Sequence, residues 1–169
     1  SRDFRFELGF TLQPDASLDP DDLVKREAAL ILERDSEVRR VKGVISDVRV
    51  GASVSGQPNI EIVLEPWFAM ARHRQDIRIY RDKTVPQIVA DVLDRFSVSH
   101  ALRLSETYPV RPYTVQFRET DHHFVNRLLE EEGFFFFFDG EGTMVIGDHT
   151  AAYDSIGGVT AIPLRAGSG

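Results

Sequence analysis

Cysteine is absent from all 169 residues of the chain. Its absence excludes disulfide bonds, thiolate metal sites and a cysteine nucleophile, and it suits a protein that folds in a reducing compartment. The sequence also lacks any apolar run approaching the length of about 18 to 20 residues that a transmembrane helix needs. It starts Ser-Arg-Asp-Phe, without the charged and apolar regions of a signal peptide. We therefore expect no signal peptide and no stable membrane insertion.

Basic stretches are equally scarce. The 20 Lys and Arg residues are outnumbered by 27 Asp and Glu, so the formal net charge is −7, and no basic run exceeds two residues. This charge repels a nucleic acid on average, and aromatic residues do not alternate with basic ones as they do in a base-stacking surface. The composition therefore predicts no nucleic-acid partner.

The first 70 residues carry the pattern of antiparallel strands. Apolar and polar residues alternate from 4 to 10, which predicts a strand with one buried face. Residues 44–50 and 60–65 predict two more strands, and the Gly, Ser, Pro and Asn between them, at 51–59, are typical of a hairpin loop. The stretch that follows Pro20 fits a helix locally better than a strand, although its apolar residues allow both.

The strand pattern breaks at residues 66–73, which we take as the domain boundary. The expected fold class is α+β, with a barrel-like domain followed by a smaller domain. The predicted units are an incomplete antiparallel β-barrel-like domain at 1–70, an α+β domain with two helices at 71–150, and the start of a following segment at 151–169.

Two helices are defined by their end signals. Thr84 and Gln87 form a capping box before an apolar stripe of helical period. The second helix starts at Thr120 or Asp121 and ends at Gly133, where the left-handed conformation favours glycine. The remaining elements predicted here are strands at 75–82, 134–138 and 143–148.

Five consecutive phenylalanines form the strand predicted at 134–138. It spans about 17 Å, which is too short to cross a membrane, and its acidic flanks oppose insertion among anionic lipids. Alternate rings point to opposite faces, so Phe134, Phe136 and Phe138 share one of them. One face can cover the preceding helix, and the other needs a further layer of the chain or another molecule. We take Phe134, Phe136 and Phe138 as the candidate interface.

Glu130, Glu131 and Glu132 occupy the last turn of the second helix, where their charges oppose the helix dipole. We expect either that some of them pair with arginines, in this chain or in a partner, or that they form a solvated acidic end. Arg127 is within reach of Glu130 or Glu131 along the helix.

Residues with catalytic or metal-binding chemistry are few. His122 and His123 are adjacent on a helix and point about 100° apart, so they do not share one metal ion. A turn explains Asp148 and His149 at the end of a strand. No nucleophile elbow, dinucleotide-binding loop or phosphate loop occurs. We therefore expect no catalytic, cofactor-binding or metal site and no enzymatic activity.

A glycan-binding or cell-wall-degrading domain is the alternative from a different class. It depends on scattered carboxylates such as Glu131 and Asp139, whose separation the sequence does not fix.

Residues 113–148, "YTVQFRETDHHFVNRLLEEEGFFFFFDGEGTMVIGD", resemble the signature of the VgrG family, the spike proteins of bacterial type VI secretion systems. The stretches "DIRIYRDKTVPQIVADVL" and "VKGVISDV" extend this resemblance to about residues 4–148. The matching positions are Tyr113, Val115, Gln116, Phe117, Arg118, Glu119, Thr120, Asp121, Phe124, Arg127, Leu128, Glu131, Glu132 and Gly133. The departures are His122 and His123, where an aromatic–acid pair is common, and the uniform phenylalanine run.

The resemblance implies a structural role without catalysis. Family members resemble the hub of a contractile phage tail, in which barrel-like domains with an α+β insertion form a trimer. The implied partners are other copies of the protein in a homotrimer, the tube protein (haemolysin-coregulated protein), and effector or adaptor proteins. The implied route is assembly in the bacterial cytoplasm and export through the secretion apparatus to the cell exterior or a target cell.

Two further expectations follow from the resemblance. It favours a short helical turn near 20–24 and a strand at 27–34, with a hairpin turn at Asp35-Ser36. A baseplate hub of a phage or phage-like contractile tail remains the nearest alternative function.

Overall fold

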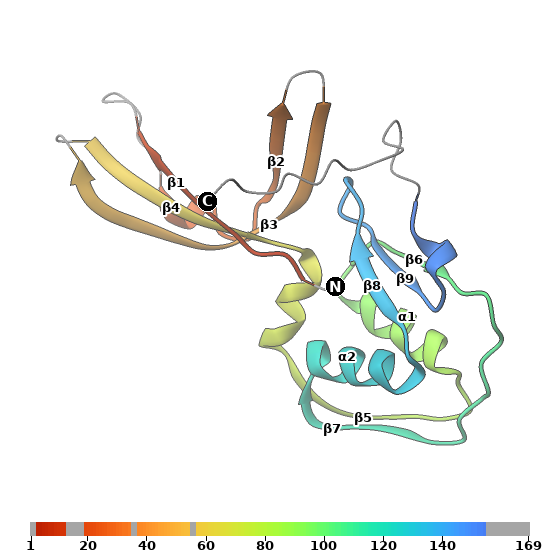
Figure 1. Cartoon of the computed structure of the whole chain (residues 1–169). Coiled ribbons are helices and arrows are strands. Elements are labelled where there is room, and N and C mark those ends of the chain that lie inside the picture. Colours follow the sequence, from red (N-terminus) through yellow and green to blue (C-terminus); the bar gives the residue numbers. More distant parts are fainter. Residues whose placement is uncertain (1–2, 13–18, 35–36, 55–56, 155–169) are drawn as a thin grey trace, which may run out of the picture.

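A computed structural model describes residues 3–12, 19–34, 37–54 and 57–154 (Figure 1). A curled four-stranded antiparallel sheet comes first, in the order β1-β4-β3-β2. Its strands are β1 (Phe6–Thr11), β2 (Glu27–Arg34), β3 (Glu37–Val54) and β4 (Gln57–Glu65). Figure 1 shows β1, β3 and β4 as a curved arm that extends away from the rest of the molecule. The sequence-based fold class, a barrel-like sheet followed by an α+β unit, is confirmed.

Two strands extend into the loop predicted at residues 51–59. Strand β3 continues to Val54 and β4 begins at Gln57, with Gly51 opposite Asn59 in the ladder. Ladder hydrogen bonds join backbone groups, so they can continue through residues whose composition is typical of a loop, and a register shift after Gly51 accommodates the irregular end. The prediction of a nine-residue loop was therefore wrong.

The ambiguous segment is a strand, as the family resemblance implies. Strand β2 pairs with β3 along its whole length, from Glu27 opposite Val44 to Arg34 opposite Glu37. The predicted helical turn before it is a short 3₁₀ helix at Pro20–Asp22, capped by the side chain of Asp19. The turn expected at Asp35-Ser36 lies outside the described residues.

The connection between the two parts of the chain is a 3₁₀ helix, Trp67–His73. It confirms that the strand pattern breaks here. The curled sheet ends at Glu65, while Phe68 is already fully buried in the core of the second part. The division at residues 70 and 71 stays a prediction.

Two helices lie between two small sheets in the second part (Figure 1). The helices are α1 (Val85–Arg95) and α2 (Asp121–Glu132). On one side is an antiparallel ribbon of β5 (Gln75–Tyr80) and β7 (Thr114–Thr120). On the other is a sheet in the order β6-β9-β8, made of β6 (His100–Arg103), β8 (Phe135–Phe138) and β9 (Met144–Gly147). A short 3₁₀ helix, Thr150–Ala152, follows β9.

The predicted start of α1 and the predicted start and end of α2 are confirmed. Thr84 and Gln87 exchange the two hydrogen bonds of a capping box. Thr120 caps α2 by accepting a hydrogen bond from the backbone N–H of His123, and Gly133 ends α2 at φ 73°. These signals fix where the helices start and stop, so their apolar faces meet in register.

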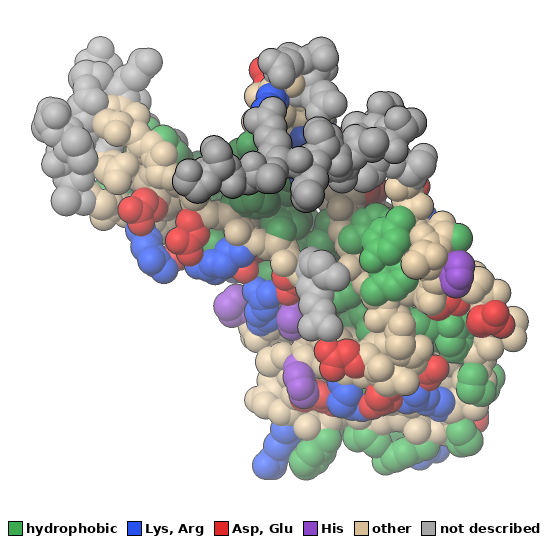
Figure 2. Space-filling view, viewed as in Figure 1, with side chains coloured by type: hydrophobic (Ala, Val, Ile, Leu, Met, Phe, Trp, Pro, Cys, Tyr) green, Lys and Arg blue, Asp and Glu red, His purple; other side chains and the backbone are tan. Residues whose placement is uncertain are grey.

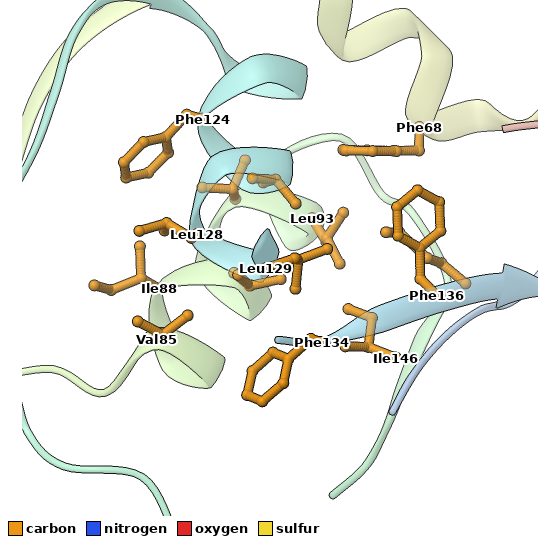
Figure 3. Close-up of a cluster of buried hydrophobic side chains, with 14 of the residues drawn as sticks. Phe68, Val85, Ile88, Leu93, Phe124, Leu128, Leu129, Phe134, Phe136 and Ile146 are labelled. Carbon is orange, nitrogen blue, oxygen red and sulfur yellow. The ribbon is translucent and has the colours of Figure 1, made fainter. Parts of the chain in front are cut away.

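The main hydrophobic core lies where the helices meet β8 and β9 (Figure 3). Leu128 and Leu129 of α2 pack there with Leu93 of α1, and Phe68 closes the side next to Phe136. The ring of Phe136 meets that of Phe68 edge to face at 5.9 Å. This core fixes the helices on which the candidate functional residues stand.

The phenylalanine run serves this core. Phe134 and Phe136 are buried against the helices, and Phe138 packs on the margin of the core and against Phe4. The proposed intermolecular face of Phe134, Phe136 and Phe138 is therefore wrong for Phe134 and Phe136, because α2 and the Trp67–His73 turn already cover them. On the opposite face, Phe135 and Phe137 stack against Tyr153.

Candidate functional site

Signature residues build a buried polar cluster between the ribbon and α2. Gln116 and Asp121 are both fully buried, and the side-chain amide of Gln116 donates a 2.8 Å hydrogen bond to Asp121 Oδ1. The guanidinium groups of Arg74 and Arg95 each lie 3.6 Å from the Asp121 carboxylate. Arg95 also donates to the Tyr80 hydroxyl at 2.8 Å. A buried carboxylate requires such partners, so this cluster joins β5, β7, α1 and α2.

A second cluster fixes the acidic end of α2. Arg127 bridges Glu119 at 2.7 Å and Glu131 at 2.8 Å. Arg111, from the loop before β7, pairs with Glu131 at 2.7 Å and with Glu132 at 2.5 Å. The expectation that glutamates of this turn pair with arginines is confirmed for Glu131 and Glu132, and the arginines belong to this chain.

These ion pairs shift the acidity of their members. The hydrogen bond from Arg111, aided by Arg127, lowers the pKa of Glu131 against the effect of desolvation. Burial acts to raise the pKa of Glu119, but the hydrogen bonds and charges of Arg127 and His123 together bring it below its ordinary value. Both carboxylates are therefore held ionised as structural anions, which is the opposite of what a general acid needs.

Arg118 stands apart from the other signature residues. It is the extra residue of a β-bulge, since Asp76 pairs with Glu119 and Ile77 pairs with Phe117. Its φ of 49° lies in the left-handed region, which non-glycine residues seldom adopt. Its guanidinium lies 5.5 Å from the centre of the Phe117 ring on the exposed side of the ribbon.

Asp148 organises a loop that sequence reasoning missed. Its carboxylate accepts hydrogen bonds from the backbone N–H groups of Ser105 and Glu106 and, at 2.8 Å, from the Tyr108 hydroxyl. Desolvation opposes ionisation, yet these bonds, led by that from Tyr108, lower the pKa of Asp148 to about 2. Burial and then the Asp148 carboxylate raise the pKa of Tyr108 to about 12. The pair fixes the loop between β6 and β7.

The two adjacent histidines have separate partners. His122 lies 2.7 Å from Asp3 and stacks on Phe68, whereas His123 lies 2.9 Å from Glu119. Among the described residues, no three His, Asp or Glu side chains are grouped to hold a metal ion. The described part of the chain also contains no helix long and apolar enough to cross a membrane.

The carboxylates considered for glycan chemistry are engaged in the fold. Glu131 is held by two arginines, and Asp139 accepts hydrogen bonds from the backbone N–H groups of Glu141 and Thr143 in its own turn. A hollow of about 200 Å³ beside Trp67 is lined by Glu27, Lys42 and Glu141, and Lys42 lies 3.8 Å from the Glu27 carboxylate. Neither Glu131 nor Asp139 is among the residues that line it.

A third polar cluster joins the curled sheet to the second part of the chain. Arg72 pairs with Asp3 and, at 2.9 Å, with the buried Glu65 at the end of β4. The Asp3 carboxylate also contacts the imidazole of His122, which lies at the start of α2. Phe4 meets Phe138 edge to face at 5.6 Å. These contacts set the direction in which the curled sheet leaves the α+β unit.

Among the residues matched to the signature, six thus hold elements of the fold together: Gln116, Glu119, Asp121, Arg127, Glu131 and Glu132. The phage tail baseplate hub (GPD) family matches residues 1–169, and the chain belongs to that family. The type VI secretion system spike protein VgrG4b of Pseudomonas aeruginosa is 33% identical over 167 residues, which is 95% of this chain and 20% of the relative. The chain therefore spans about a fifth of that relative's length.

Solved structures show the same fold. The E. coli c3393 protein superposes with a TM-score of 0.80 and 27% identity over 92% of this chain and 45% of that one. It is described as a component of the type VI secretion system with structural similarity to the T4 bacteriophage tail proteins gp27 and gp5. A chain of the Francisella PdpA-VgrG complex matches with a TM-score of 0.66 at 14% identity, over 88% of this chain and 26% of that one. The fold is that of phage tail hub proteins.

Proposed function

We propose that the chain is the hub part of a type VI secretion spike, which joins the tube to the puncturing tip. The observation that carries this proposal is the match to the E. coli c3393 protein over 92% of the chain. The charged clusters of the described residues support it, because they hold elements of the fold together. The module works by assembly rather than by catalysis.

Exposed apolar residues on the curled sheet support a trimeric hub. Ile31 and Val38 are exposed on the same face of β2 and β3, since Val38 lies opposite Glu33 in the ladder. Single exposed apolar residues are common, but neighbouring ones on one face of an open sheet are typical of a surface that a partner covers. In the proposed assembly, neighbouring copies cover this sheet, and the tube protein (haemolysin-coregulated protein) meets the resulting ring.

The same proposal gives the path and the cargo. The hub assembles in the bacterial cytoplasm and leaves through the secretion apparatus, so it reaches the cell exterior or the target cell. The Francisella PdpA-VgrG complex provides the precedent for a VgrG that is bound to a second protein. By analogy, we propose that an effector or adaptor protein binds to the natural protein that contains this chain.

Light scattering tests the hub proposal directly. The molar mass is measured for this chain and for the natural protein that contains it. A trimeric natural protein is expected, and Ile31→Asp with Val38→Asp should weaken the trimer without unfolding it. A natural protein that stays monomeric at all concentrations would contradict the proposal. The family match is also compatible with the phage-tail alternative. Deletion of the secretion apparatus distinguishes the two, because only a secretion spike should then lose its export from the cell.

A further inference from the structure

The outer side of the β5–β7 ribbon is an exposed apolar surface. Ile77, Ile79, Tyr113 and Phe117 are 57%, 53%, 57% and 63% exposed. Ile77 lies opposite Phe117 in the ladder, and Ile79 lies opposite the half-buried Val115. We call these five residues the ribbon face. Figure 2 shows hydrophobic side chains along the lower edge of the molecule, where Figure 1 places β5 and β7, away from the curled sheet.

This orientation is the reverse of an ordinary half-buried strand. Gln116 and Tyr80 alternate with the apolar residues and point inward, toward the cluster around the buried carboxylate of Asp121: Gln116 donates to Asp121, and the Tyr80 hydroxyl accepts from Arg95. Because side chains alternate between faces with period two, the polar cluster inside forces the apolar residues outward. The inward polar side is satisfied within the chain, whereas the outward apolar side is left in water, which is typical of an interaction surface.

Two arginines bracket the ribbon face. Arg81 follows β5 and lies two residues after Ile79, so it continues the alternation of Ile77 and Ile79 and extends the ribbon face at one end. Arg118 lies at the other end, where the bulge places its guanidinium over the Phe117 ring. Bulges re-aim side chains next to functional surfaces, and strained residues persist where their neighbours fix them.

Neither arginine has an acidic partner among the described residues. Nearby arginines do: Arg74 and Arg78 pair with Asp76, and Arg111 pairs with Glu131. Unpaired cations at both ends of an apolar strip are notable in a chain with a net charge of −7. They make the ribbon face complementary to apolar side chains with a carboxylate at each end.

A second copy of this chain fits the ribbon face poorly. If two copies met through this face about a two-fold axis, each would bring its own Arg81 and Arg118 to the rim of the same contact. The contact would then contain four arginines and none of the acids that pair with arginine elsewhere in the fold. Like charges at a rim oppose association.

We propose that the ribbon face docks a segment of a different protein, one that presents apolar side chains between two acidic groups. From Ile77 to Arg81 the strand advances about 13 Å. On a helix, residues seven apart lie on the same face with a rise of about 10.5 Å, and the long Glu and Arg side chains can span the remainder. A helical partner segment with an apolar stripe and carboxylates seven residues apart on the side of that stripe satisfies both arginines. Assembly of the hub through the curled sheet leaves this face available.

Two matched peptides test the proposal. One is a 16-residue amphipathic helix with a Leu and Phe stripe and two Glu seven residues apart on the side of that stripe, and the other has Lys in place of each Glu. Fluorescence anisotropy with the full chain should give the Glu peptide a Kd of about 100 µM or tighter and the Lys peptide at least tenfold weaker binding. Because the chain has a net negative charge, nonspecific attraction favours the Lys peptide. Tighter binding of the Glu peptide would therefore show the local effect of Arg81 and Arg118.

Variants locate the binding. Ile79→Ser should abolish binding of the Glu peptide, while Ile31→Ser, at a residue that is 54% exposed on the curled sheet, should leave it unchanged. The double change Arg81→Glu with Arg118→Glu should reverse the preference toward the Lys peptide, which loss of folding cannot produce. Thermal melts check that each variant is folded.

Other outcomes overturn the proposal. These are equal binding of the two peptides, binding that Ile79→Ser does not affect, and no binding of either. Concentration-dependent dimerisation that Ile79→Ser abolishes would assign the face to a second copy. Binding to anionic phospholipid vesicles without peptide binding would assign it to a membrane surface.

Discussion

Gln116 and Asp121 form a fully buried hydrogen-bonded pair, with the amide nitrogen of Gln116 2.8 Å from the carboxylate of Asp121. The sequence places them five residues apart, on either side of the junction between β7 and α2. Two arginines from other elements complete the charge balance of the carboxylate. The pair therefore connects a signature motif to the packing of the whole α+β unit.

Removing the Asp121 carboxylate should destabilise the fold strongly. Asp121→Ala leaves Arg95 and Gln116 without their buried acceptor, and breaking such a pair typically costs about 3–5 kcal/mol. The free energy of unfolding from urea titrations measures the effect. Asp94→Ala, at an exposed acid of α1, is the control and should change stability by less than about 0.5 kcal/mol. Equal effects of the two changes would contradict the central role of Asp121.

Asp148 should make the stability of the chain depend on acidic pH. Its pKa falls from 3.8 to about 2 in the folded chain, so the unfolded chain takes up the proton first as the pH drops. The stabilisation is complete above the unfolded value and is lost as the pH falls through about 2. Melting temperatures of Asp148→Asn, measured from pH 5 downward, should fall less steeply than those of the unmodified chain. Parallel curves would rule out this linkage.

The end of α2 provides a test of backbone conformation alone. Gly133 has φ 73°, and a Cβ added there would meet nothing within 4 Å. Gly133→Ala should therefore cost about 1–2 kcal/mol through the left-handed conformation rather than through a clash. Gly133→Asn should cost less, because asparagine tolerates this region better. Chemical denaturation measures both, and a larger loss for Asn than for Ala would contradict the assignment.

Local signals explain what the sequence predicts well. The capping box at Thr84 and the glycine at 133 act through their immediate neighbours, so the helix ends follow from a few residues. The alternation at residues 75–80 likewise predicts β5. It does not reveal that Ile77 and Ile79 point outward, because that depends on Asp121, Arg74 and Arg95 meeting inside.

Other features depend on contacts between distant residues. Asp148 binds the loop at Ser105 across more than forty positions, and no periodic pattern marks either partner. The bulge at Arg118 appears only when β5 and β7 are aligned. The strand at 27–34 is fixed by pairing with β3, which overrides the helical preference of its residues. The interface prediction for Phe134 and Phe136 was wrong for the same reason, because the sequence does not reveal which distant residues cover these two rings.

The phenylalanine run allows that last point to be tested with two adjacent rings. Phe136 is buried between Phe68 and the helices, so Phe136→Ala should cost about 3–5 kcal/mol. Phe137 is half-buried and stacks mainly on the exposed Tyr153, so Phe137→Ala should cost clearly less. Urea titrations of the two variants give the comparison, and light scattering of each checks the assembly state. If Phe137→Ala destabilises the chain more than Phe136→Ala, the faces of β8 have been assigned the wrong way round. If Phe136→Ala instead leaves stability unchanged but dissolves an oligomer, the ring belongs to an intermolecular contact.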